Sequence, residues 1–194
     1  MHSLLKDLEE LQRQLSGGTI QRSYRALLSY MMGLRSHFKN KYPESSVSNL
    51  YQGYMDMTYF AIFTPALKQY DLKIAIVFNY EAFRFEAWLA GRNRKVNRQY
   101  WELLKTQKLS GYRIVAPGKG VDSIIECDLA QGFDLIDMDT LTKTIEKGTD
   151  TFISDIEALL LSITWKSFIL WLNNAFHLDG NSADVWEMGS GHEK

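Results

Sequence analysis

The chain begins with two segments in which apolar residues recur at helical spacing. Residues 3–15 carry leucines three or four positions apart with charged residues between them, and Gly17 and Gly18 follow. This spacing places the leucines on one face of a helix, and glycine favours helix ends, so we expect a short amphipathic helix. The same reasoning predicts a second, longer helix that is capped by Thr19 and ends before Pro43.

The middle of the chain changes to a strand-like pattern. Segments rich in β-branched and aromatic residues predict strands at 55–63, 72–78 and 83–89. Because only a short turn separates the last two, we expect them to form an antiparallel hairpin. A short helix is expected to begin at Thr64 and Pro65, between the first and second strands.

After the third strand the helical and strand-like patterns alternate. Residues 93–107 place their apolar side chains on one face and predict a helix. Residues 112–116 and 121–129 flank a turn rich in glycine and predict a second hairpin. From residue 139 helical spacing returns, and residues 158–178 are strongly apolar. We therefore expect a long C-terminal helix.

These elements predict an α+β fold with a mostly antiparallel sheet of about five strands. Two N-terminal helices, one central helix and the long C-terminal helix are expected to pack on it. Residues 1–160 are predicted to form a single domain, and residues 161–194 an apolar helical extension with a polar, mobile tail. The large apolar side chains of the extension lead us to expect a homodimer that forms through it.

Composition and charge limit the classes of partner that this chain is expected to bind. Of the 194 residues 45% are hydrophobic, which is enough for a buried core. Because 22 Lys and Arg nearly balance 23 Asp and Glu, no overall field attracts the chain to nucleic acid or anionic lipid. Lys166 in the apolar segment also opposes a membrane span. We therefore expect neither nucleic acid nor a membrane as partner, and the single Cys127 predicts a cytoplasmic location.

The third strand carries the first candidate site. Its alternation places Arg84, Glu86 and Trp88 on the face opposite its apolar residues. This face is either a solvated surface with an ion pair or the floor of a polar pocket, and the large aromatic beside paired charges favours the pocket. Asp56 and Thr58 of the first strand are expected to add to the pocket wall.

The second candidate lies directly after this strand. Arg92, Arg94 and Arg98 surround a predicted helix start, where free N–H groups can bind an anion, and Trp101 continues the same helical stripe. Alternatively, these arginines pair with acidic side chains such as Glu86 and cover Trp101 with their aliphatic stems. Both interpretations stay open at the level of sequence.

Several motifs resemble an uncharacterised bacterial family, a domain of unknown function. They are SYMMGLR at residues 29–35, LYQGYMDMTYF at 50–60, FEAWLAG at 85–91 and GVDSIIE at 120–126. The resemblance covers about residues 10–160. It implies a shared fold and assigns no activity.

The order of elements is also similar to that of restriction-endonuclease-like folds. Such enzymes hold magnesium with an acid on one strand and Glu-x-Lys on the next. Asp71 and Glu86 occupy the comparable places here, but Trp88 stands where the lysine belongs. A degenerate or divergent metal-dependent nuclease is therefore the alternative hypothesis.

The leading hypothesis is a non-catalytic binding or accessory domain for a small molecule or anion. We expect no metal or cofactor, because four scattered histidines and one thiol offer no ligand spacing. The candidate ligand-binding residues are Asp56, Thr58, Arg84, Glu86, Trp88, Arg92, Arg94, Arg98 and Trp101.

Overall fold

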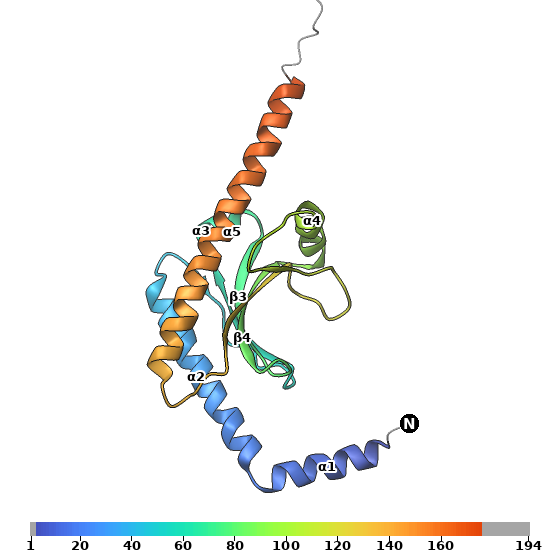
Figure 1. Ribbon diagram of the computed structural model, residues 1–194, viewed down its shortest axis with the longest axis vertical. Coiled ribbons are helices and arrows are strands. Elements are labelled where there is room, and N and C mark those ends of the chain that lie inside the picture. Colours follow the sequence, from blue (N-terminus) through green and yellow to red (C-terminus); the bar gives the residue numbers. More distant parts are fainter. Residues whose placement is uncertain (1–2, 176–194) are drawn as a thin grey trace, which may run out of the picture. The chain divides into compact units, whose positions relative to one another are not determined.

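One antiparallel sheet organises the fold (Figure 1). The computed structural model describes the backbone of residues 3–175 and the side chains of residues 3–165. Within these residues the sheet has six strands in the order β1-β2-β3-β4-β6-β5. The strands are β1 (Ser46–Val47), β2 (Met57–Phe63), β3 (Leu72–Asn79), β4 (Arg84–Gly91), β5 (Arg113–Ile114) and β6 (Ile125–Gln131).

Helices flank the sheet and confirm the predicted α+β fold. They are α1 (Leu4–Ser16), α2 (Thr19–Lys41), α3 (Pro65–Gln69), α4 (Arg94–Leu104) and α5 (Met138–Ala175). The chain divides into two compact units, Met1–Ser154 and Asp155–Lys194, so the boundary falls inside α5. The division predicted near residue 160 stays a prediction.

The sheet differs from the prediction at one edge. Between the helix that ends before Pro43 and the strand predicted from residue 55, the structure contains β1, which pairs antiparallel with β2 through Ser46 and Phe63. A strand of two residues is too short for its alternation to be visible in the sequence. At its start β2 is also shorter than predicted, because Met55 has a φ of 64° and cannot continue an extended strand.

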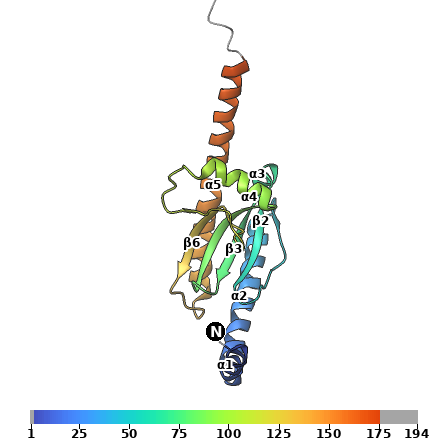
Figure 2. The same cartoon turned by 90° about the vertical axis from the view of Figure 1, so that its right-hand side faces the viewer.

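The core lies on one face of the sheet. In Figures 1 and 2, α2 and the first part of α5 cover this face. Phe60, Phe78 and Phe85 come from three neighbouring strands and are fully buried, as is Phe38 on α2. Burial of such aromatic side chains is the main favourable contribution to folding.

Polar contacts fix the start of α5 to α2. The hydroxyls of Tyr30 and Thr142 lie 3.1 Å apart. His37 Nε2 is 2.6 Å from the carboxylate of Glu146, which also pairs with Lys41. Lys41 Nζ is 2.7 Å from Asp150 as well. These contacts connect segments that are more than 100 residues apart in the sequence.

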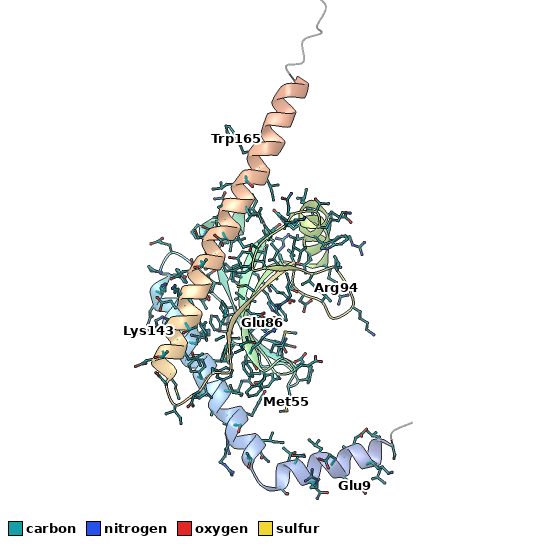
Figure 3. The ribbon with its side chains drawn as sticks, in the orientation of Figure 1. Glu9, Met55, Glu86, Arg94, Lys143 and Trp165 are labelled. Atoms are coloured by element: carbon teal, nitrogen blue, oxygen red, sulfur yellow. The ribbon has the colours of Figure 1, made fainter. Side chains whose placement is uncertain are left out.

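The opposite face of the sheet is only partly covered. Helix α4 crosses one end of the strands on this side (Figures 1 and 2), and Figure 3 shows Arg94 of α4 and Lys143 of α5 on opposite sides of the sheet. Asn93 is the N-cap of α4, and its side chain accepts a hydrogen bond from the N–H of Val96 at 3.0 Å. A pocket lies beside α4 on this face.

The second unit is described only over its helical part. Leu161 and Trp165 are about two-thirds exposed, at 65% and 64%. None of the described helices combines the length and apolar character that crossing a membrane requires. The predicted polar tail, residues 179–194, lies outside the described residues.

Candidate functional site

The two faces of β4 differ as its alternating pattern predicts. Phe85, Ala87 and Leu89 are fully buried on the face that carries the core. Arg84, Glu86 and Trp88 project from the other face. Phe83 was expected to continue the apolar face, but it lies in the turn before β4 with a φ of 48° and is 59% exposed.

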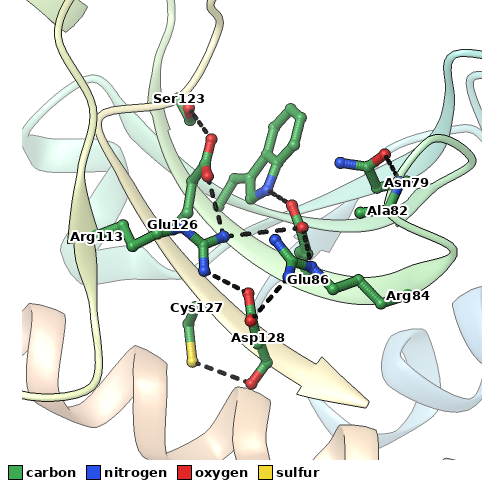
Figure 4. A network of polar contacts seen from close by, with 10 residues as sticks. Asn79, Ala82, Arg84, Glu86, Arg113, Ser123, Glu126, Cys127 and Asp128 are labelled. Carbon is green, nitrogen blue, oxygen red and sulfur yellow. Dashed lines mark hydrogen bonds and ion pairs between the residues drawn. The ribbon is translucent and has the colours of Figure 1, made fainter. Parts of the chain in front are cut away.

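Glu86 is the centre of a closed polar cluster (Figure 4). Its side chain is only 1% exposed. It accepts hydrogen bonds from Arg84 Nε at 2.5 Å and from the indole N–H of Trp88 at 2.6 Å. Arg113 of β5 lies 3.8 Å from the same carboxylate. The charge of Glu86 is therefore satisfied by neighbouring side chains rather than by water.

The acidic residues of β6 complete this cluster. Arg113 donates to Asp128 at 2.6 Å and to Glu126 at 3.2 Å, and Arg84 lies 3.1 Å from Asp128. The register brings them together, since Glu86 is paired with Asp128. With its donors and acceptors directed at one another, the cluster is neither a bare surface nor an open pocket floor. It stabilises the sheet.

A pocket of about 210 Å³ lies next to this cluster, toward α4. Small residues of the sheet, Ala75, Ala90 and Gly91, leave the space open, and the aromatic rings of Tyr59 and Trp88 line it. The volume is below the roughly 300–1,000 Å³ of pockets for drug-sized ligands. The pocket therefore suits a small group, and its aromatic lining favours a planar one.

Positive charge exceeds negative charge around the pocket. Lys73, Arg92 and Arg94 line it, against the single carboxylate of Asp122. Arg92 lies 3.2 Å from Asp71, whereas Arg94 has no ion pair among the described residues. Of these residues, Arg94 is therefore the guanidinium most available to a ligand.

Lys73 and Tyr59 form the inner wall of the pocket. Lys73 Nζ lies 5.9 Å from the centre of the Tyr59 ring, within reach of a cation–π contact. Burial raises the pKa of Tyr59, and the nearby Asp122 adds to this effect. The phenol therefore stays protonated at neutral pH and can donate a hydrogen bond to an anion.

Asn97 holds α4 in position above the pocket. Its side-chain oxygen accepts a hydrogen bond from the N–H of Gly91 at 2.6 Å, and its amide group donates to the carbonyl of Asp122 at 3.0 Å. Only glycine fits at position 91, because an added Cβ would lie 2.7 Å from a methyl carbon of Val96. The end of β4, the start of α4 and the loop before β6 are thus fixed to one another.

The structure separates the predicted site residues into groups. Trp88, Arg92 and Arg94 line the pocket. Arg84 and Glu86 belong to the neighbouring cluster, as described above. Arg98 and Trp101 lie further along α4, where Trp101 is covered by Lys105 at 5.1 Å rather than by an arginine.

Two predicted wall residues lie elsewhere. Thr58 is paired with Phe78 and so shares the core face, where its hydroxyl lies 3.1 Å from Tyr80. Asp56 precedes β2 in an exposed loop, and its carboxylate accepts the N–H groups of Tyr54 and Met57. Because β2 begins at residue 57, residue 56 lies on no strand face, and the register places residue 58 on the core face instead of the pocket face.

The sequence reasoning missed Tyr59, Lys73, Asn97 and Asp122. Lys73 could have been found from the β3–β4 hairpin, since that register pairs it with Ala90 on the pocket face. Nothing comparable in the sequence indicates Asn97 or Asp122, because their roles depend on how α4 and a loop pack on the sheet.

The carboxylates expected in a nuclease centre do not converge. The carbonyl of Asp71 accepts a hydrogen bond from the N–H of Arg92, which places it opposite that residue. Glu86 lies six positions earlier on β4, and at about 3.3 Å per residue the separation is about 20 Å. One metal ion cannot bind both. Among the described residues, no group of three or more His, Cys, Asp or Glu side chains could hold a metal ion.

Fold and pocket together define a six-stranded α+β protein with a small cationic site beside α4. Residues 4–160 match a family described as Domain of unknown function (DUF7000), and the chain belongs to this family. This confirms the resemblance inferred from the motifs, and the matched region begins a few residues earlier than expected. Neither the curated proteins nor the solved structures contain a match to this chain.

Proposed function

We propose that this protein is a non-catalytic binding module for a small anionic ligand with a planar group. The observation that carries the proposal is the pocket beside α4, where two aromatic rings and three cations surround about 210 Å³. Its aromatic lining suits the planar group, while Lys73 and Arg94 supply positive charge. The single Cys127 supports a cytoplasmic location, in which thiols stay reduced.

The experiment compares two ligands of nearly the same shape, benzoate and benzamide, by thermal denaturation. A ligand that binds the native state raises its stability by about 2.7 kcal/mol at a concentration of 100 times its Kd. We expect benzoate to raise the melting temperature and benzamide, which is neutral, to have a much smaller effect. Equal effects of both compounds, or none, would contradict an anion site.

Lys73→Met tests whether the response comes from this pocket. Methionine keeps an unbranched apolar side chain on β3 and removes only the charge, so the fold is expected to persist. The stabilisation by benzoate should be lost. Lys147→Met, which removes an exposed lysine of α5, is the matched control and should respond like the wild type.

A further inference from the structure

The segment around α4 is far more basic than the chain as a whole. Residues 92–119 contain eight Lys or Arg and one Glu, a net charge of +7. Because the whole chain has 22 basic and 23 acidic residues, the remainder holds 14 basic and 22 acidic residues, a net charge of −8. The net charge of −1 is therefore the sum of a positively charged segment, residues 92–119, and a negatively charged remainder of the chain.

Part of this charge lines a groove that adjoins the ligand pocket. The groove, of about 610 Å³, lies between α4 and the turn at residues 117–120. Arg94, Lys95 and Arg98 of the helix and Lys119 of the turn line it, and it contains no acidic residue. It shares Arg94 and Asn97 with the pocket, so the two hollows adjoin.

The cations of the groove have no anionic partners. Within residues 3–165, no carboxylate forms an ion pair with Arg94, Lys95, Arg98 or Lys119. By contrast, Arg92, Lys105 and Arg113 of the same segment form ion pairs. Like charges around one hollow repel each other, which is unfavourable in free energy. An anion placed between them offsets this repulsion.

The cations form a row rather than a single point. At a rise of 1.5 Å per residue, Arg94 and Arg98 are about 6 Å apart along the helix axis. Lys105, about two turns beyond Arg98, lines another hollow of about 460 Å³ together with Lys108. A single phosphate or carboxylate would engage only one end of this row, whereas a chain with repeated negative charges would follow it.

We propose that the groove binds the phosphate backbone of a single-stranded nucleic acid, with one base in the pocket between the sheet and α4. This rests on the proposed function, since the base and its phosphate are the planar and anionic groups assigned to the pocket. Aromatic rings that contact bases and a cationic groove that follows the backbone are the usual means of binding single strands. The proposal does not extend to double-stranded nucleic acid, because the bases of a duplex are stacked and paired inside the double helix and cannot enter the pocket.

This proposal reverses the expectation drawn from net charge. The charge of the whole chain does not attract nucleic acid, but phosphate contacts depend on the charges within a Debye length, which is about 8 Å at physiological ionic strength. The lining of the groove contains cations and no carboxylate.

The test is the salt dependence of binding of a labelled single-stranded oligothymidylate, measured by fluorescence anisotropy. For single strands the logarithm of the binding constant falls with the logarithm of salt concentration by about 0.7 per phosphate contacted. Four cations therefore predict a slope of about −3. In Arg98→Ala/Lys119→Ala the slope should weaken by about 1.4.

Matched controls separate this proposal from the function of the pocket. Lys68→Ala/Lys147→Ala removes two exposed cations outside the groove and should leave the slope unchanged. Arg98 and Lys119 do not line the pocket, so their double variant should still be stabilised by benzoate. If benzoate stabilises the protein but the oligonucleotide does not bind at low salt, only the groove proposal is wrong.

Three other outcomes would also overturn the proposal. The groove is not the site if the double variant keeps the wild-type slope. If polyaspartate competes as well as the oligonucleotide, the partner is an acidic polypeptide rather than a nucleic acid. Tighter binding of a duplex of the same length would exclude the single-stranded form.

Discussion

Glu86 occupies an unusual position for a carboxylate, because it is buried in the middle of a sheet face. Its two neighbours on the strand, Arg84 and Trp88, both donate to it, and Arg113 approaches from β5. Removing the charge weakens these interactions without creating a cavity. The polar cluster on this face is therefore arranged around one buried charge.

Glu86→Gln should lower the free energy of unfolding by about 1.5–3 kcal/mol, the usual range for a hydrogen bond to a charged group. The loss is limited because Arg84 keeps Asp128 at 3.1 Å as a counter-charge. The measurement is a urea titration that compares the midpoint and slope with those of the wild type.

Glu102→Gln is the matched control, since Glu102 pairs with Lys105 on the exposed surface of α4. An exposed pair of this kind contributes about 0–1 kcal/mol. If both variants had the wild-type urea midpoint, the buried cluster would make no measurable contribution to the stability of the fold.

The membership of this cluster could be predicted only in part. Strict alternation placed Arg84, Glu86 and Trp88 on one face, and that placement depends on β4 alone. Asp128 reaches Glu86 because the register shifts between Phe85 and Glu86. Such a bulge has no sequence signal here, and it changes which residues of the next strand face the cluster.

At the scale of elements, the contact between α2 and α5 depends on charges that titrate. Hydrogen bonds from Lys41 and then His37 lower the pKa of Glu146 below its ordinary value. A carboxyl whose pKa is lower in the folded state stabilises the protein above its unfolded pKa. This stabilisation is lost as the pH falls through the folded value.

We therefore expect Glu146→Gln to be less stable than the wild type at neutral pH. The difference should begin to shrink as the pH falls below the ordinary Glu pKa of about 4.3, and it should vanish once Glu146 is protonated in the folded protein. Unfolding by urea at a series of pH values measures this difference. A constant difference across the whole range would show that the pair acts through packing rather than charge.

The elements themselves were largely predictable, since each long segment has a clear period. Leucines at helical spacing indicated α1, and alternating or continuous apolar residues indicated β2, β3 and β4. The short strand β1 and the exact start of β2 were not predictable. They depend on strand pairing and on the positive φ of Met55, which are determined by tertiary contacts.

At the scale of the whole molecule, the second unit presents apolar side chains to solvent. Leu161 and Trp165, four positions apart on α5, are both exposed. Of the large apolar residues expected to form the dimer interface, Ile163 is half-buried and Trp165 is exposed, whereas those at 168, 169, 171, 172 and 176 lie outside the described side chains. The homodimer expected to form through this segment therefore remains a prediction.

Light scattering on the full chain should give the mass of a dimer. Leu161→Ser/Trp165→Ser should shift the protein toward the monomer, because an obligate interface needs apolar contacts. Leu4→Ser/Leu8→Ser removes two exposed leucines from α1 and is the matched control. A monomeric wild type at all concentrations would contradict the dimer.

The positive charge of residues 92–119 also gives the α4 side of the first unit a local field that the net charge of the chain does not reveal. A protein with a net charge of −1 would ordinarily have little electrostatic preference for its orientation. Here a segment of +7 sits within a chain whose remainder carries −8. Close to an anionic surface the protein would turn its α4 side inward, so its isoelectric point is a poor guide to how it adsorbs or approaches a partner.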